Sequence, residues 1–270
     1  MRKQPTIGVF DSGMGGLTVL KALLQIVPHA NYLYFGDTAR LPYGSKSAET
    51  VAKYAAGATE FLEKQGAELL VIACNTATAL ALDKITQAAH APVVGVVEPG
   101  AEQARSASKT HKVVVIGTEA TINSHAYHKA LESRGMQAKE KACPLFVPLV
   151  EEGWVDHPVT ESVGQIYLSE AFRDGFESAD VLVLGCTHYP LIKPMLGKIT
   201  PPGVQIVDSA ESTARAVAEK IAGQSGNHTS SYTPSDIKFY VTDSVKKFGD
   251  LGTRFLGQPI KQVEHVDLKE

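Results

Sequence analysis

The sequence predicts an α/β fold made of two similar halves, each a mainly parallel sheet flanked by helices. Short runs rich in Val, Ile and Leu alternate with helix-patterned segments, which is the pattern of βαβ units. These runs are continuous rather than alternating, as in strands that are covered on both faces. Two of the runs end in nearly the same residues, around Cys74 and Cys186, which indicates an internal duplication.

Seven short apolar runs are expected to form the strands. They cover residues 7–10, 32–35, 69–73, 93–97, 113–117, 181–184 and 204–207. Amphipathic stretches lie between them. In residues 47–65, for example, apolar side chains from Val51 to Leu62 recur at helical spacing, and Gly66 follows where this helix should end.

The strand pattern also predicts how the chain divides into domains. Residues 1–97 form the first α/β half and residues 98–207 the second. The remaining segment, 208–270, is too small to stand alone, and we expect it to return and complete the first domain. Residues 223–235, which are polar and rich in Gly and Ser, predict a loop.

Composition and charge are those of a globular protein without a nucleic-acid partner. Of 270 residues, 44% are hydrophobic and 20% are charged, which excludes disordered, collagen-like and disulfide-stapled chains. Lys and Arg number 26 against 29 Asp and Glu, so the net charge is −3. The basic character that duplex nucleic acid demands is therefore missing.

The cysteines and the N-terminus indicate a cytoplasmic chain. The three cysteines are an odd number and include no CxxC pair. The first apolar run is too short for a signal peptide, and no run approaches the ~20 residues of a membrane span. We therefore expect free thiols in a reducing cytosol and no membrane partner.

Two of the cysteines lie where ligands bind in open α/β sheets, at the carboxyl ends of strands. Cys74 and Cys186 each stand where a helix should begin, and a helix N-terminus lowers the pKa of a thiol from ~8.5 toward neutrality. A buried structural role is the alternative, and it is the commoner one for a single free cysteine. The matching positions favour function for this pair, whereas Cys143, in an apolar context, is expected in the core.

Two facing thiols suit proton transfer better than other cysteine chemistry. A reducing cytosol disfavours a disulfide, and no other His or Cys lies within four residues of Cys74 to give the spacing of a metal site. One thiolate can remove a proton from carbon while a thiol on the opposite face returns one. At a stereogenic carbon, that reaction is racemisation or epimerisation.

Polar groups near these strand ends suggest supporting roles. The glycine-rich run 11–16 (DSGMGG) fits neither a Walker loop nor GxGxxG, but its amides suit a carboxylate. Asp11 either accepts a proton or holds an ammonium group, or it is a helix cap before the glycine turn. His188 either supports the Cys186 thiolate or packs at the strand end. Glu151 is most simply a solvated acidic turn.

Four motifs in this order resemble the glutamate racemases of the cofactor-independent aspartate/glutamate racemase family. They are residues 11–16 (DSGMGG), 41–44 (LPYG), 73–77 (ACNTA) and 185–190 (GCTHYP). The resemblance implies two pseudo-symmetric domains that enclose the substrate. It also implies an isomerase that interconverts L- and D-glutamate and supplies D-glutamate for peptidoglycan in the bacterial cytoplasm.

The resemblance assigns roles to individual residues. Cys74 acts on the α-proton of D-glutamate and Cys186 on that of L-glutamate, with Asp11 and His188 as their catalytic partners. Glu151 aligns loosely with a further family acid. Substrate-binding positions are Asp11, Ser12, Tyr43, Gly44, Asn75, Thr76, Thr118, Thr121, Thr187 and His188.

The resemblance further implies no pyridoxal phosphate, no metal and a homodimer. Some family members require a cell-wall precursor as activator, and no motif here decides whether this chain does. Two other functions stay open. One is an isomerase or decarboxylase of the same superfamily that acts on another small acid; the other is a carboxylate-binding protein without turnover. Both cysteines argue against the second, since binding needs neither thiol.

Overall fold

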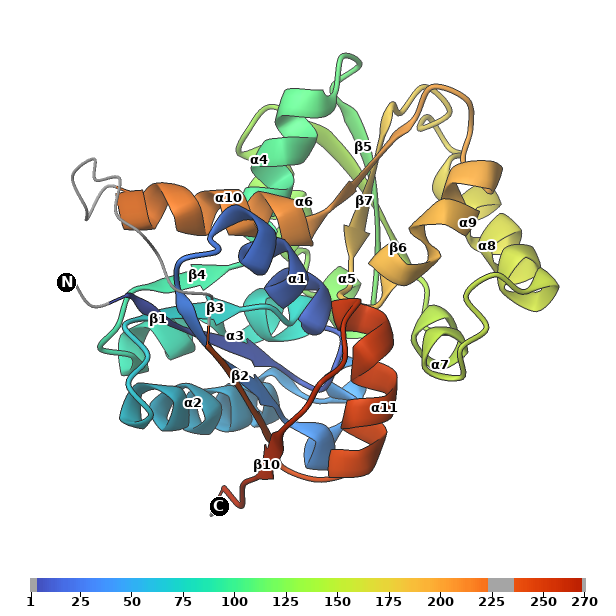
Figure 1. The fold of residues 1–270 in the computed structure, drawn as a ribbon. Helices are drawn as coiled ribbons and strands as arrows, with labels where there is room; N and C mark the ends of the chain where they lie inside the picture. Colours follow the sequence, from blue (N-terminus) through green and yellow to red (C-terminus); the bar gives the residue numbers. More distant parts are fainter. Residues whose placement is uncertain (1–3, 223–235, 269–270) are drawn as a thin grey trace.

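The computed structural model describes residues 4–222 and 236–268 and confirms the predicted α/β class (Figure 1). The chain builds two separate sheets, and every strand pairing in them is parallel. The predicted loop at 223–235 lies outside the described residues. None of the helices in the described part of the chain is long and apolar enough for a membrane span.

The first sheet has six strands in the order β10-β9-β2-β1-β3-β4. Four come from the start of the chain and two from its end, so the C-terminal segment returns to this sheet beside β2. The strands are β1 (Thr6–Asp11), β2 (Asn31–Gly36), β3 (Leu69–Ile72), β4 (Val93–Gly95), β9 (Ile237–Val241) and β10 (Val263–His265).

The second sheet has four strands in the order β6-β5-β7-β8. They are β5 (Lys112–Gly117), β6 (Gln137–Ala142), β7 (Val181–Gly185) and β8 (Gln205–Asp208). All four come from the middle of the chain. Division of the chain into domains at residues 97 and 208 stays a prediction.

Helices cover both sheets, and α10 runs between the two halves against α1 and α4 (Figure 1). The helices are α1 (Leu17–Ile26), α2 (Ala48–Lys64), α3 (Asn75–Ala88), α4 (Val97–Ala107), α5 (Glu119–Asn123), α6 (Ala126–Glu132), α7 (Phe146–Glu151), α8 (Pro158–Ala171), α9 (Lys193–Ile199), α10 (Ser209–Ala222) and α11 (Val245–Leu256), with 3₁₀ helices η1 (Thr38–Arg40), η2 (Tyr43–Ser45) and η3 (Tyr189–Ile192).

Helix α2 forms where the periodicity predicts it. The Ser47 hydroxyl accepts the backbone N–H of Thr50 at 3.3 Å and so caps the first turn. Gly66 follows the helix with φ +97°, a conformation that glycine adopts without strain. The buried face carries Val51, Ala55 and Leu62, as the spacing indicates.

Three strands escape the sequence pattern. β6 reads QAKEKA and is half-exposed at the edge of its sheet, so it has no continuous apolar run. In the first sheet, β10 is an edge strand of only Val263–His265, and β9 lies next to it, between β10 and β2. The run at 93–97 also departs from its prediction, because the strand stops at Gly95 and α4 begins at Val97.

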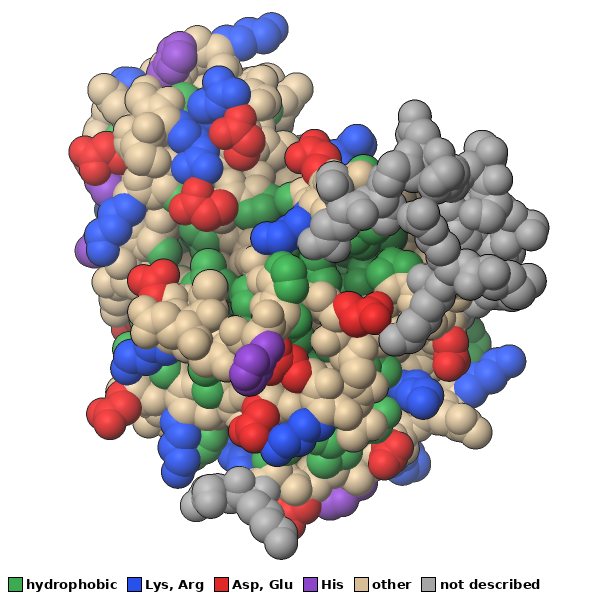
Figure 2. Space-filling model, turned by 90° about the vertical axis from the view of Figure 1, so that its left-hand side faces the viewer, with side chains coloured by type: hydrophobic (Ala, Val, Ile, Leu, Met, Phe, Trp, Pro, Cys, Tyr) green, Lys and Arg blue, Asp and Glu red, His purple; other side chains and the backbone are tan. Residues whose placement is uncertain are grey.

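The surface carries both signs of charge. On the face drawn in Figure 2, basic and acidic side chains of the described residues are interspersed rather than gathered by sign. This distribution agrees with the small net charge of −3.

Candidate active site

A cavity of about 550 Å³ lies where the carboxyl ends of the two sheets face each other. Both Cys74, after β3, and Cys186, after β7, line it. Most of the other predicted site residues line it too, while Asp11 and Thr121 lie one hydrogen bond behind it. The lining residues among those predicted are Ser12, Tyr43, Gly44, Cys74, Asn75, Thr76, Thr118, Cys186, Thr187 and His188.

Cys74 stands at the N-terminus of α3, as the sequence predicts. Its sulfur accepts the backbone N–H of Ala77 at 3.4 Å, and its thiol donates to Ser12 Oγ at 3.5 Å. The expected lowering of its pKa is wrong. Burial, reinforced by the Asp11 carboxylate, raises the pKa of Cys74 to about 12. This effect outweighs the hydrogen bonds with Ser12 and Ala77, which lower the pKa.

Cys186 has a different local structure. β7 ends at Gly185, and the next element is the short 3₁₀ helix η3, so the helix expected to begin at Cys186 begins only at Lys193. The side chain is buried, and His188 hydrogen-bonds to it. This thiol therefore faces an imidazole, whereas Cys74 faces a hydroxyl and a carboxylate.

His188 is held from three sides. Its Nε2 lies 3.3 Å from Glu151 Oε1, and its ring packs edge-on against Phe255 with centroids 5.1 Å apart. Gly15 lies against the third side, where a Cβ would stand 2.5 Å from His188 Nδ1. Burial alone would lower the pKa of His188, but hydrogen bonds to Cys186 and Glu151 and the Asp11 charge raise it to about 10.

Asp11 is fully buried and ties the glycine-rich turn to the second cysteine loop. Its Oδ2 accepts the N–H of Gly13 at 2.9 Å, and its Oδ1 accepts from Thr187 Oγ1 at 3.5 Å. It is not the cap of α1, because that position belongs to Gly16. Burial raises the pKa of Asp11, although the nearby His188 opposes the change.

Hydroxyl and amide groups join the two halves at the cavity wall. Thr76, on α3, lies 2.9 Å from Thr118 and 3.2 Å from Thr121 on the second half, measured between hydroxyl oxygens. Asn75 accepts the phenol of Tyr127 at 2.7 Å. Thr76 and Thr118 both lie on the wall of the cavity.

The loop at 41–44 reaches the cavity, but one of its side chains is already bonded elsewhere. The Tyr43 hydroxyl donates to Asp37 Oδ2 at 2.6 Å. Gly44 packs against Thr118, where a Cβ would lie 3.2 Å from the threonine Cβ. This loop therefore shapes the wall of the cavity and closes it against the second half.

Glu151 and Lys247 change the sequence-based interpretation. The solvated acidic turn expected at Glu151 is wrong, because the residue ends α7, lines the cavity and has a side chain only 20% exposed. Lys247, on α11, lies 3.3 Å from Glu151 Oε2 and also lines the cavity. No sequence motif marks Lys247; its neighbour Lys246 looks the same in the chain.

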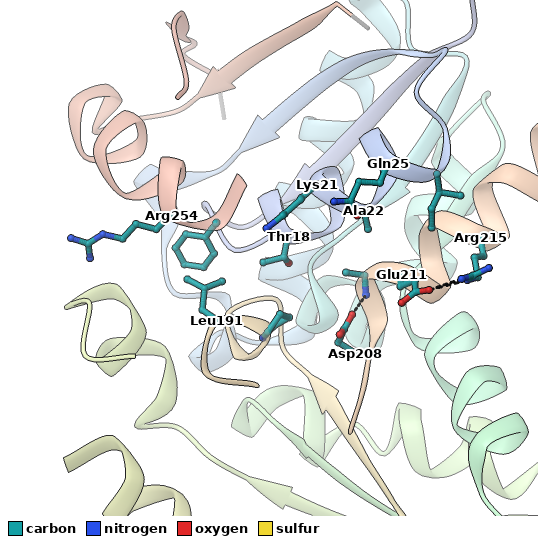
Figure 3. Close-up of a pocket in the computed structure, with 13 residues that line it drawn as sticks. Thr18, Lys21, Ala22, Gln25, Leu191, Asp208, Glu211, Arg215 and Arg254 are labelled. Atoms are coloured by element: carbon teal, nitrogen blue, oxygen red, sulfur yellow. Dashed lines mark hydrogen bonds and ion pairs between the residues drawn. The ribbon is translucent and has the colours of Figure 1, made fainter. Parts of the chain in front are cut away.

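A second cavity of about 470 Å³ lies behind the first, between α1, η3, α10 and α11 (Figure 3). Lys21, Arg215 and Arg254 line it together with Asp208 and Glu211, and neither Cys74 nor Cys186 is among its lining residues. Phe255 lies on its wall while touching His188, which lines the first cavity. Within residues 4–222 and 236–268, no three His, Cys, Asp or Glu side chains are grouped to hold a metal ion.

Comparison with known proteins identifies the family. The model of the Asp/Glu/Hydantoin racemase family matches residues 7–217, which include both cavity cysteines and every predicted site residue. The chain belongs to this family.

Members of this racemase family resemble the chain over its whole length. A glutamate racemase from Koribacter versatilis is 60% identical and covers 99% of both chains. The solved glutamate racemase of Thermus thermophilus, in complex with β-chloro-D-alanine, is 43% identical with a TM-score of 0.87 over 98% of each chain. That of Francisella tularensis, in complex with D-glutamate, is 38% identical with a TM-score of 0.89 over 98% of each chain.

Proposed function

We propose that this protein is a glutamate racemase that moves the α-proton with Cys74 and Cys186. One observation carries the proposal: two buried thiols, from corresponding strand ends of two similar sheets, open on one cavity. The names of the relatives reported above support glutamate as the substrate. We also propose that D-glutamate for peptidoglycan is the product that the cell uses.

The reaction needs one thiolate and one thiol. Starting from L-glutamate, the Cys186 thiolate takes the α-proton and becomes a thiol, leaving the electron pair on the α-carbon. Cys74 then gives its proton to the opposite face and becomes the thiolate. The reverse sequence converts D-glutamate, so Cys74 and Cys186 exchange roles in each direction.

Surrounding groups must make this weak carbon acid reactive. The carbanion gains charge on its carboxylate, so fixed donors in a site that excludes water have the largest effect. Ser12, Asn75, Thr76, Thr118 and Thr187 are donors on the cavity wall. Such donors replace an electron sink, and we propose that the reaction uses neither pyridoxal phosphate nor a metal.

His188 and Asp11 serve the two thiols differently. A protonated His188 beside Cys186 stabilises that thiolate, and its pKa of about 10 keeps it protonated at neutral pH. Asp11, close to both Cys74 and Thr187, is placed to help the Cys74 proton leave when D-glutamate is the substrate.

The proposal includes the setting of the enzyme. We expect a cytoplasmic homodimer and a response to a cell-wall precursor. Gel filtration with light scattering measures the first, and activity with and without the precursor measures the second. A monomer at assay concentrations, or equal rates with and without precursor, would contradict these two expectations separately.

The experiment that tests the function follows L-glutamate, D-glutamate and both aspartate enantiomers in D₂O by NMR and polarimetry. Loss of the α-proton signal together with decay of rotation, for glutamate and not aspartate, is the expected result. Exchange with aspartate alone would mean that the substrate is aspartate rather than glutamate. Absence of exchange with every acid, even with the precursor present, would overturn the proposal.

A further inference from the structure

We propose that Lys247 is a positioning residue that holds Glu151 against His188 and so supports proton transfer at Cys186. The inference deepens the proposed racemase function and rests on it. Lys247 lies on α11, which belongs to the first half, whereas Glu151 ends α7 of the second half. The pair therefore crosses the cavity from one half to the other.

The geometry gives Glu151 two partners on its two oxygens. Oε1 lies 3.3 Å from His188 Nε2, and Oε2 lies 3.3 Å from Lys247 Nζ. The Glu151 side chain is 20% exposed, so water competes for it when one partner is removed. Because one carboxylate bridges both groups, the ammonium of Lys247 fixes the rotamer that points Oε1 at the imidazole.

Two further contacts show that the face of α11 that carries Lys247 also packs against His188 and the end of α7. Phe255 packs on His188, and Arg254 lies so close to Gly153, just after α7, that a Cβ there would overlap its guanidinium. Lys247, Arg254 and Phe255 are seven and eight positions apart, which puts them on one side of a helix. In Figure 1, α11 lies beside α7 along the edge between the two halves.

A second role for Lys247 would be attraction of the anionic substrate. Among the described residues that line the cavity, Lys247 carries the permanent positive charge. Substrate attraction would act on binding, with a strong dependence on salt. Positioning of Glu151 acts on the proton transfer after binding. The two roles therefore separate in kcat and KM.

Four single variants and one double variant make the test. Lys247→Gln removes the charge, and Lys247→Arg keeps it. Lys246→Gln is the matched control, because Lys246 is 93% exposed and pairs along α11 with Asp250 at 3.0 Å. Glu151→Gln, alone and with Lys247→Gln, shows whether Lys247 acts through Glu151. Each protein is assayed with both glutamate enantiomers at two salt concentrations.

The expected result is a fall in kcat of about two- to fivefold for Lys247→Gln, in keeping with a partly exposed ion pair. KM should stay within about twofold, Lys247→Arg should recover most of the rate, and Lys246→Gln should match the wild type. In the Glu151→Gln background, Lys247→Gln should change kcat no further.

Several results would overturn the inference. One is an unchanged kcat for Lys247→Gln; another is a salt-dependent rise in KM alone, which would indicate substrate attraction. A third is an effect of Lys247→Gln that persists in full without the Glu151 carboxylate. If the wild type and Lys246→Gln both fail to racemise glutamate, the proposed function is wrong, and the inference on Lys247 is wrong with it. If both are active, a contrary result for the Lys247 variants overturns only the inference.

Discussion

The two thiols occupy matching places in two similar sheets, yet their surroundings differ in charge. Cys74 caps α3 and faces the Ser12 hydroxyl and the Asp11 carboxylate. Cys186 has no such helix and faces His188, which is itself bonded to Glu151. The two strand ends thus match, but the helix that follows and the charges around each thiol do not.

This difference shows in the charges beside the two thiols. A pKa of about 12 keeps Cys74 a thiol at neutral pH, and a pKa of about 10 keeps His188, the neighbour of Cys186, protonated. In the proposed mechanism, Cys74 is therefore ready to act as the acid when L-glutamate is the substrate. Conversion of D-glutamate first requires the Cys74 proton to leave, and Asp11 is the group placed to help it leave. The predictions below probe this asymmetry, from the largest expected effect to the smallest.

Removal of either thiol should have the largest effect. Cys74→Ala and Cys186→Ala should each lower kcat by about a thousandfold, within the 10²–10⁴ range for a positioned acid or base. Polarimetry measures the rate, and Cys143→Ala is the control, because Cys143 is buried away from the cavity and the loss there is one of packing. Substantial turnover by either single variant would break the two-thiol account.

Gly15→Ala should come next. The added methyl would overlap His188 Nδ1, at 2.5 Å, and Thr187 Oγ1, so the Cys186 side must move. Small displacements of catalytic groups cost about a hundredfold in rate. Gly57→Ala is the control, since nothing lies within 4 Å of its added Cβ and helix α2 should gain about 0.5–1 kcal/mol of stability. Equal activity in the two variants would contradict the packing described here.

Asp11→Asn and His188→Asn should each slow a different direction of the reaction. Enantiomers have equal free energy, so kcat/KM must stay equal in the two directions for every variant. The asymmetry therefore shows in kcat, and KM must differ between the two directions in the same proportion. Loss of the Asp11 carboxylate should lower kcat more from D-glutamate, and loss of His188 more from L-glutamate, by about tenfold or more. Parallel assays from each enantiomer measure both values, and identical ratios in the two variants would contradict the division of roles.

A shift in pH dependence is the smallest expected effect. His188 acts in its protonated form, which is lost as pH rises through its pKa of about 10, so kcat should fall on that alkaline side. The groups facing it are Cys186, Asp11, Glu151 and the Phe255 ring. Glu151 raises the pKa of His188, so Glu151→Gln should move the alkaline fall to lower pH. A profile of kcat against pH for both proteins measures it; a move to higher pH would contradict the assignment.

The sequence predicted most of the framework that carries the site. Continuous apolar runs and the repeated ends around Cys74 and Cys186 lead to two sheets whose strand ends meet, because buried parallel strands leave a clear pattern. The edge strands β6 and β10 show no such pattern in the sequence, since edge strands need no continuous apolar run.

The remaining features depend on tertiary packing. A helix N-terminus should lower the pKa of Cys74, but the depth of its burial reverses the direction. Likewise, nothing in the chain distinguishes Lys247 from Lys246, because only the approach of α11 to α7 gives one of them a partner across the cavity. Local patterns predict which elements form, whereas burial and contacts between distant elements decide how their groups behave.

The most direct test of two thiols on opposite faces is the position of deuterium at early turnover. L-glutamate is incubated with the enzyme in D₂O, the reaction is stopped within the first few per cent, and the enantiomers are separated for mass spectrometry. Because Cys74 donates a solvent-derived deuteron while Cys186 keeps the abstracted proton, the D-glutamate should carry one deuterium and the recovered L-glutamate none. Deuterium in both enantiomers at equal rates would mean a single base and would contradict the account.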